Sequence, residues 1–156
     1  MKTVLMIMLV SLMTSFSGLA SDKILTEGSK LGQWTMDLDA VKKKSNGKPI
    51  LINFTGSDWC GWCKLMEKDV FKKEAWWKYA EKNVNMVWID FPSDKSKVPQ
   101  KFVSRNELLA KKYGVQGFPT YIILSADGSK VLGTLGAGRG KTPKSFAKEV
   151  DALIKK

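Results

Sequence analysis

A pair of cysteines lies just after a predicted buried strand and limits the folds that this chain can adopt. Cys60 and Cys63 are its only cysteines, and residues 49–54, shortly before them, are apolar at nearly every position. A short apolar run without alternation is typical of a central strand that is covered on both faces. The residues after Cys63 place apolar side chains at helical spacing. We therefore expect a strand, a short loop and a helix that begins at Cys60.

A thiol at the start of a helix is chemically activated. The first backbone N–H groups of a helix have no partner within it and the dipole is positive at that end, so both favour the thiolate of Cys60. A low-pKa thiol is better populated as the thiolate and leaves more easily in disulfide exchange. Cys63 follows one helical turn later, where it can resolve a mixed disulfide. The spacing therefore predicts a redox-active pair.

Two other roles for the cysteine pair stay open from the spacing alone. A structural disulfide would close so short a loop that the chain-entropy model gives only about 2 kcal/mol. A zinc site needs four protein ligands, or three with one open position. Because the sequence contains no histidine, a site within one chain would need carboxylates, or else ligands from a second chain. We expect no metal.

The first twenty residues have the pattern of a secretory signal. Lys2 supplies the positive start, and residues 4–13 form an apolar run that is too short to span a membrane. Small residues between Ser17 and Ala20 fit a cleavage site. We expect residues 1–20 to be a signal peptide, with an uncleaved membrane anchor as the alternative. Export would bring the cysteines into an oxidising compartment, where protein disulfides persist.

The remaining length indicates one folded domain. Residues 21–33 show no strong period and are expected to form a flexible lead-in, whereas residues 34–156 are expected to form the domain. The formal net charge is +11, which could suit nucleic acid, an anionic membrane surface or an acidic partner. We expect no nucleic acid, because the chain has an export signal and because its lysines fall at the spacing of solvated helix surfaces.

The rest of the chain predicts alternating strands and helices. The expected strands are 49–55, 84–90, 120–124 and 130–135, and the expected helices are 60–68, 76–82, 107–113 and 143–154. Residues 34–44 are expected to form a short helix, or an extended entry followed by a helix. Residues 91–104 are polar, contain two prolines and are predicted to be a long loop. Trp76, Trp77 and Tyr79 are expected to be core aromatics. The order indicates an α/β fold, with a central mixed sheet flanked by helices on both faces.

Two motifs resemble those of the thioredoxin-like family. Trp-Cys-Gly-Trp-Cys-Lys at 59–64 resembles its active-site motif, with Trp62 where a proline is usual, and Gly-Phe-Pro-Thr at 117–120 resembles its cis-proline loop. The resemblance covers the chain from about residue 48 to its end and implies the thioredoxin fold. Residues 55–58 and 91–104 resemble in particular exported bacterial disulfide reductases, of the DsbH type or like the C-terminal domain of the DsbD transporter.

The resemblance implies a role for each motif residue. Cys60 would be the exposed nucleophile that attacks a client disulfide, and Cys63 would be the buried resolving thiol. Pro119 in cis would hold the adjoining main chain so that it can pair with a bound peptide. The residues implied in client binding are Trp59, Gly61, Trp62, Phe118, Pro119 and Thr120. For Thr120, an ordinary strand position is an equal alternative.

The sequence departs from the family pattern at two places. The buried aspartate that accepts the proton of the resolving thiol in thioredoxins is replaced by Asn53. An amide takes no proton, so the acceptor would be water, Asp58, Glu67 or another group. The dipeptide between the cysteines also lacks the histidine that strong oxidants of this fold carry. This second departure favours a reducing or intermediate potential.

The expected function is that of a periplasmic thiol–disulfide oxidoreductase that reduces disulfides of client proteins. It would be a monomer, would need no cofactor beyond the Cys60–Cys63 disulfide, and would receive electrons from a membrane donor of the DsbD type. A disulfide oxidase or isomerase is the nearest alternative. A non-catalytic thioredoxin-fold binding adaptor and a thiol-dependent metal carrier are the alternatives from other functional classes.

Overall fold

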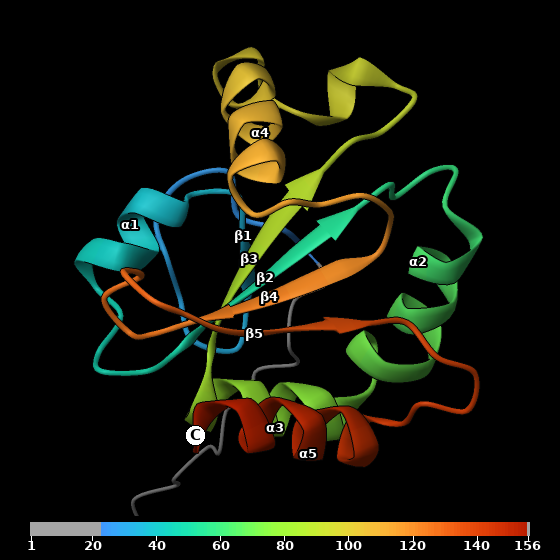
Figure 1. Ribbon diagram of the computed structural model, residues 1–156. Coiled ribbons are helices and arrows are strands. Elements are labelled where there is room, and N and C mark those ends of the chain that lie inside the picture. Colours follow the sequence, from blue (N-terminus) through green and yellow to red (C-terminus); the bar gives the residue numbers. More distant parts are fainter. Residues whose placement is uncertain (1–22, 156) are drawn as a thin grey trace, which may run out of the picture.

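The computed structural model describes residues 23–155, so the expected signal peptide lies outside the described residues. A five-stranded mixed sheet has helices on both of its faces (Figure 1), which confirms the predicted fold class. Between residues 23 and 33 the only strand-like contact is a single parallel bridge from Leu25 to Thr35. Over residues 23–155, no helix combines the length and the hydropathy needed to cross a membrane.

The sheet is ordered β1-β3-β2-β4-β5, with the strand before the cysteines at its centre. β2 (Ile50–Thr55) lies parallel to β3 (Asn85–Asp90) and antiparallel to β4 (Thr120–Leu124). The edges are β1 (Trp34–Thr35), parallel to β3, and β5 (Val131–Gly136), antiparallel to β4. Every residue of β2 and β3 is buried. Because helices cover both faces, these strands are apolar with little alternation.

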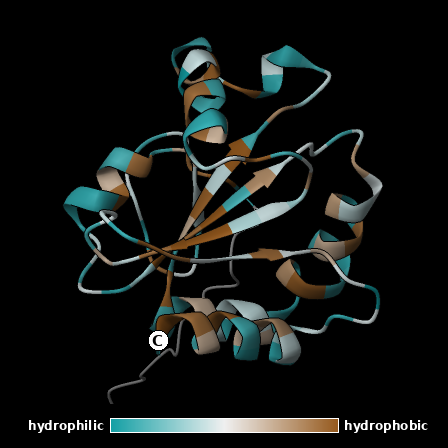
Figure 2. Ribbon diagram, in the orientation of Figure 1, coloured by the Kyte–Doolittle hydropathy of each residue, from teal (hydrophilic) through white to brown (hydrophobic). Residues whose placement is uncertain are grey.

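The helices divide between the two faces of the sheet. They are α1 (Leu38–Lys43), α2 (Gly61–Met66), the π-helical η1 (Glu67–Phe71), α3 (Glu74–Asn83), the 3-10 helix η2 (Lys95–Lys97), α4 (Gln100–Lys112) and α5 (Pro143–Ile154). Buried side chains of α2, α3 and α5 belong to one hydrophobic cluster, whereas α1 and the later part of α4, with Leu109 and Ala110, pack on the other. In Figure 2 the strands and inward helix faces are hydrophobic and the outer faces are polar.

The cluster under α2, α3 and α5 is built from aromatic rings. The ring of Phe71 lies between 5.2 and 5.5 Å from those of Trp34, Trp76, Tyr121 and Phe146. Edge-to-face pairs of this kind are favourable beyond the area that they bury. Trp76 and Trp77 are buried, as predicted, and Tyr79 packs against the cluster while half-buried. α2 and η1 pack against this aromatic cluster.

The prediction of a long loop over 91–104 is wrong. η2 occupies residues 95–97, and α4 has 13 residues and begins at Gln100, whereas the sequence had indicated a helix only over 107–113. Pro99 lies within the predicted loop, and it directly precedes the first helical residue. Proline is tolerated at a helix start, because the first N–H groups of a helix have no intrahelical partner in any case.

The cause of this error is a polar residue on the inner face of α4. Asn106 is 3% exposed and sits between the apolar contacts of Phe102 and Leu109, so it interrupts the apolar period. Its Nδ2 donates a hydrogen bond to the main-chain oxygen of Asp90 at 3.1 Å. The side-chain amide of Asn106 is therefore buried because it binds the end of β3. The local sequence pattern does not reveal this contact.

Smaller differences concern helix and strand ends. The predicted helix over 60–68 is α2 continued by η1, with Cys60 as the N-cap residue. α3 begins two residues earlier than predicted, at Glu74, and β5 begins one residue later, at Val131. Thr142 caps α5 with Pro143 in its first turn, as predicted.

Candidate functional site

The cysteine pair lies where the loop after β2 enters α2. Cys60 and Cys63 are joined by a disulfide, with their Cα atoms 5.2 Å apart. The backbone N–H of Cys63 donates a hydrogen bond to the Sγ of Cys60, with N and S 3.1 Å apart. Each cysteine is 5% exposed. Cys63 is therefore buried as expected, whereas the expectation that Cys60 is exposed is wrong for the disulfide form. Because α2 runs into η1 without a break, the dipole of both segments and this N–H group favour negative charge on the Cys60 sulfur.

The loop that contains Pro119 is adjacent to the cysteine loop. The peptide bond between Phe118 and Pro119 is cis. Thr120 begins β4 and pairs in register with Phe54 of β2, so both loops leave the same end of the sheet. The hydroxyl of Thr120 donates to the main-chain oxygen of Gly117 at 2.7 Å, which uses this side chain within the loop.

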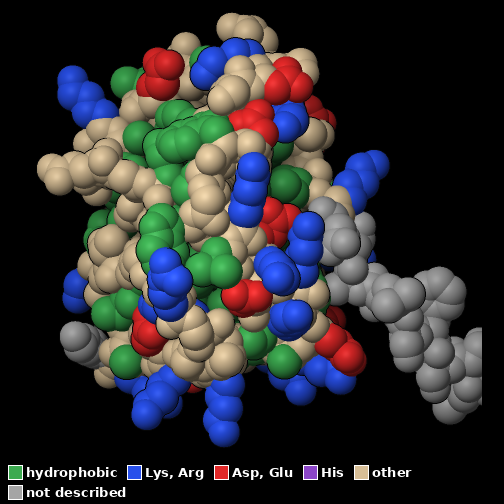
Figure 3. All heavy atoms as spheres, turned by 90° about the vertical axis from the view of Figure 1, so that its right-hand side faces the viewer, with side chains coloured by type: hydrophobic (Ala, Val, Ile, Leu, Met, Phe, Trp, Pro, Cys, Tyr) green, Lys and Arg blue, Asp and Glu red, His purple; other side chains and the backbone are tan. Residues whose placement is uncertain are grey.

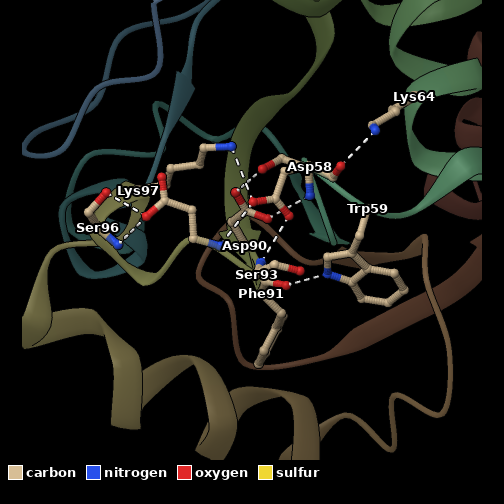
Figure 4. A network of polar contacts seen from close by, with 10 residues as sticks. Asp58, Trp59, Lys64, Asp90, Phe91, Ser93, Ser96 and Lys97 are labelled. Atoms are coloured by element: carbon tan, nitrogen blue, oxygen red, sulfur yellow. Dashed lines mark hydrogen bonds and ion pairs between the residues drawn. The ribbon is translucent and has the colours of Figure 1, made fainter.

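Trp59 is held over the site by contacts from three segments. Its ring lies 5.7 Å from that of Phe118, edge to face, and its Nε1 donates to the main-chain oxygen of Phe91 at 2.8 Å (Figure 4). A Cβ on Gly56 would lie 2.5 Å from the indole, so glycine is required there. The side chain is nevertheless 52% exposed. Trp59 is therefore fixed in place while one face remains open to a partner.

Asp58 ties the cysteine loop to the segment that follows β3 (Figure 4). Its carboxylate accepts hydrogen bonds from the backbone N–H groups of Ser93 and Asp94, at 2.9 and 3.0 Å, and pairs with Lys97 at 3.2 Å. These backbone donors, helped by Lys97, lower the pKa of Asp58 to about 2. Lys64 also donates to the main-chain oxygen of Asp58 at 2.6 Å. The carboxylate therefore stays ionised at neutral pH.

A second tie joins the same loop to the end of β3. The backbone N and the Oγ of Ser57 donate to the carboxylate of Asp90 at 2.9 and 2.6 Å. Asp90 is 5% exposed, and its main-chain oxygen accepts from Asn106 of α4. Sequence reasoning missed Asp90 and Asn106. The sequence did contain a signal for Asp90, because an acidic residue at the end of the largely apolar strand 85–90 is unusual.

The second candidate proton acceptor, Glu67, lies on η1. Its carboxylate pairs with Lys72 at 3.0 Å, and it borders a small cavity lined by aromatic residues of the core. Glu67 and Asp58 thus come from different segments, and each is bound to a cation.

Asn53 occupies the middle of the sheet on the face under α2, η1 and α3. It pairs in register with Trp88 of β3 and Tyr121 of β4, and all three side chains are buried. The Oδ1 of Asn53, the Nε1 of Trp88 and the hydroxyl of Tyr121 have no hydrogen-bond partner among the described residues. Burial raises the pKa of Tyr121. Three polar atoms thus lie in one row of the sheet, with no carboxylate among them.

Gly61 and Trp62, the dipeptide between the cysteines, face outward. Trp62 is 46% exposed, and with Gly61, Leu65 and Arg139 it lines a shallow groove. The guanidinium of Arg139 lies 5.7 Å from the centre of the Trp62 ring. Among residues 23–155 there is no cluster of three or more histidine, cysteine, aspartate or glutamate side chains that could hold a metal.

Comparisons with known proteins agree with this geometry. A family model described as a thioredoxin-like domain matches residues 36–153. The sequence is 34% identical over 122 residues to the disulfide bond reductase DsbH of Chlamydia pneumoniae, covering 78% of this chain and 72% of that protein. It is 32% identical over 123 residues to the thiol-disulfide oxidoreductase ResA of Bacillus anthracis, covering 76% of this chain and 60% of ResA.

Solved structures show the same likeness. A DsbH oxidoreductase superposes with a TM-score of 0.71 at 29% identity, covering 87% of this chain and 96% of that one. A thioredoxin from Thermus thermophilus superposes with a TM-score of 0.57 at 19% identity, covering 78% and 85%. The second match concerns the fold alone.

Proposed function

This chain belongs to the thioredoxin-like family and is a thiol–disulfide oxidoreductase, and we propose that it reduces disulfides of client proteins in the periplasm. The observation that carries the proposal is the bonded pair of Cys60 and Cys63 at the start of α2, with a backbone N–H directed at the Cys60 sulfur. Similarity to a disulfide bond reductase supports the direction of electron flow. The signal-like pattern of residues 1–20 supports export.

The reaction starts from the dithiol form. The Cys60 thiolate attacks one sulfur of the client disulfide, so that a mixed disulfide forms and the other client sulfur leaves and takes a proton from solvent. Cys63 then loses its proton and attacks the Cys60 sulfur, which releases the second client thiol. The client gains two electrons and two protons, and the protein ends in the disulfide form. A membrane electron donor of the DsbD type would restore the dithiol.

The proton of Cys63 goes to water in this proposal. Both carboxylate oxygens of Asp58 already have partners, namely the backbone N–H groups of Ser93 and Asp94 and the ammonium of Lys97. Glu67 is paired with Lys72. Asn53, at the buried position under α2, cannot take a proton. These contacts favour solvent over either carboxylate.

Client binding would use the surface around the disulfide. Trp59 and Trp62 are large exposed apolar side chains on either side of Cys60, and Phe118 packs against Trp59. The main chain next to Pro119 would pair with an extended client segment. Because the Thr120 hydroxyl is bonded to Gly117, Thr120 would contribute through its main chain. The protein would act as a monomer.

The proposal is tested by reduction of insulin, with electrons supplied by dithiothreitol. Wild-type protein should accelerate precipitation of the insulin B chain, and the Cys60→Ser variant should give the uncatalysed rate. Equal rates for the two proteins would contradict an enzymatic role. Circular dichroism of the variant serves as the control for folding.

The direction is tested by redox titration of the mature domain against glutathione. A reductase should have a potential near the thioredoxin value of about −270 mV, because the dipeptide Gly61-Trp62 carries no charge that would stabilise the reduced form. A potential near about −120 mV would instead identify an oxidant.

A further inference from the structure

The groove beside the disulfide contains a cation that no carboxylate of the described residues neutralises. We propose that Arg139, whose guanidinium lies over the ring of Trp62, binds an acidic residue close to the client cysteine, so that the protein prefers disulfides in acidic segments. This inference rests on the proposed function, since it names the class of client that the same site takes.

The groove borders the reacting sulfurs. It is lined by Gly61, Trp62, Leu65 and Arg139. Gly61 directly follows Cys60, and Trp62 directly precedes Cys63, so the groove starts beside the bond that is exchanged. A client sulfur bonded to Cys60 therefore brings its own neighbouring residues to this groove. This position favours a client segment over a lipid surface as the occupant.

Arg139 is exposed and is oriented by an aromatic ring. It belongs to the loop between β5 and α5, and its guanidinium lies 5.7 Å from the centre of the Trp62 ring. Cation–π attraction to an aromatic ring restrains a guanidinium while its N–H groups stay available. Arg139 forms no ion pair with a carboxylate of residues 23–155. A guanidinium presented in this way fits a carboxylate through two parallel hydrogen bonds.

The neighbouring cation, Lys141, is already paired. Its Nζ contacts the carboxylate of Glu149 at 2.5 Å and donates to the main-chain oxygen of Gly136 at 3.1 Å. These contacts brace the loop that carries Arg139, and they leave Lys141 without a role toward a client. Arg139 is therefore the free charge of this loop.

The charge around the groove complements an acidic client. The first turn of α2 contains no acidic residue, and Lys64 of α2 donates to a main-chain oxygen and not to a carboxylate. Figure 3 shows the side of the molecule that carries α2, where lysine and arginine side chains outnumber the aspartate and glutamate side chains that lie among them in its middle and lower parts. The whole chain has a formal net charge of +11.

The test uses three peptide disulfides that differ only in the residue two positions from the cysteine, which is Glu, Gln or Lys. Second-order rate constants for their reduction by the dithiol protein are followed by the change in tryptophan fluorescence. Wild type should reduce the Glu peptide about three-fold faster than the Gln peptide, the size expected for one exposed ion pair, and the Lys peptide should be slowest. Arg139→Gln should remove the difference between the Glu and Gln peptides, whereas Arg139→Lys should keep part of it.

The control variant is Lys111→Gln on α4, which removes an exposed charge from the helix over the opposite face of the sheet. It should keep the full preference for the Glu peptide. Equal rates of wild type on the Glu and Gln peptides, or the same preference in Arg139→Gln, would overturn the acidic subsite. A membrane role would also overturn it: Arg139→Gln would then bind anionic vesicles more weakly than wild type does, while all variants would reduce the three peptides at the same rates.

Failure of the proposed function has a different signature. Wild-type reduction of hydroxyethyl disulfide, a small uncharged substrate, measures the exchange reaction without any client side chain. If this reduction is absent, the reductase proposal is wrong. If it proceeds and the peptide preference is missing, only the acidic subsite is wrong.

Discussion

Asp58 shows how one side chain sets the position of the reactive loop. Its carboxylate is held by two backbone N–H groups of the segment after β3, and its pKa is lowered to about 2. A group with a depressed folded-state pKa stabilises the fold above its unfolded pKa of about 4, and this stabilisation is lost as pH falls toward the folded value. The contribution should therefore be complete at neutral pH.

Asp58→Asn should lower the urea midpoint of unfolding at pH 7, and the difference from wild type should shrink as pH falls from about 4 to about 2. The reason is that protonated Asp58 and asparagine have nearly the same hydrogen-bonding capacity. Urea titrations of both proteins across this range measure the effect. A difference that is constant with pH would show that the ionised carboxylate is not what binds the loop.

Asn53 allows a second prediction, in which the introduced carboxyl should have a raised pKa and not a lowered one. Asn53 is 2% exposed, and its Oδ1 has no partner among the described residues. In Asn53→Asp, burial without a partner should raise the folded-state pKa of the new carboxyl. The destabilisation should be small near pH 4. It should grow by about 1.4 kcal/mol per pH unit above the unfolded pKa, until pH reaches the folded pKa.

The measurement is the free energy of unfolding of Asn53→Asp and wild type between pH 4 and 8. A variant that is as stable as wild type at pH 8 would mean that position 53 is hydrated or has a cationic partner. That result would also weaken the reason for assigning the Cys63 proton to solvent.

At the scale of elements, the junction between β2 and α2 concentrates the contacts that orient the site. Trp59 fits against Gly56 so closely that an added Cβ would lie 2.5 Å from its ring. Gly56→Ala should therefore displace the indole, break its bond to Phe91 and slow client reduction several-fold. The rate with insulin measures the activity, and tryptophan fluorescence reports whether the indole has moved. Unchanged fluorescence and rate would mean that the loop absorbs the extra methyl group.

The helices and strands differ in how well the sequence predicts their ends. β2 and α5 were predicted close to their observed ends, because an unbroken apolar run and a Thr-Pro cap are local signals. α4 was mistaken for a loop at its first two turns, because Asn106 interrupts the apolar stripe for the sake of a contact with Asp90. That contact joins residues 16 positions apart, and no local pattern encodes it.

The candidate site was predictable to a similar extent. The spacing of Cys60 and Cys63 predicted a bond within one helical turn, and the structure contains that bond. The ties from Asp58 and Asp90 cross 33 to 39 positions in sequence, so their partners follow from the order of strands and not from the motif. The placement of Arg139 over Trp62 depends on the sheet in the same way, because it brings the loop after β5 beside α2.

For the whole molecule, the redox state of the cysteine pair should affect global stability. A disulfide reductase is more stable in its disulfide form than in its dithiol form. In strongly oxidising proteins such as disulfide oxidases, the dithiol form is the more stable one. The disulfide form should therefore unfold at a higher urea concentration than the dithiol form. Because the loop that it closes is short, the difference should be only about 2 kcal/mol. The opposite order would indicate an oxidant.

The central claim is that the Cys60 sulfur exchanges bonds with client proteins and that Cys63 releases them. The most direct measurement is mass spectrometry of Cys63→Ala after incubation with a protein that contains a disulfide. We expect a one-to-one mixed disulfide that maps to Cys60, persists in the absence of other thiols and is missing in the matched Cys60→Ser variant. A folded Cys63→Ala protein that forms no such adduct, or the same adduct in Cys60→Ser, would contradict it.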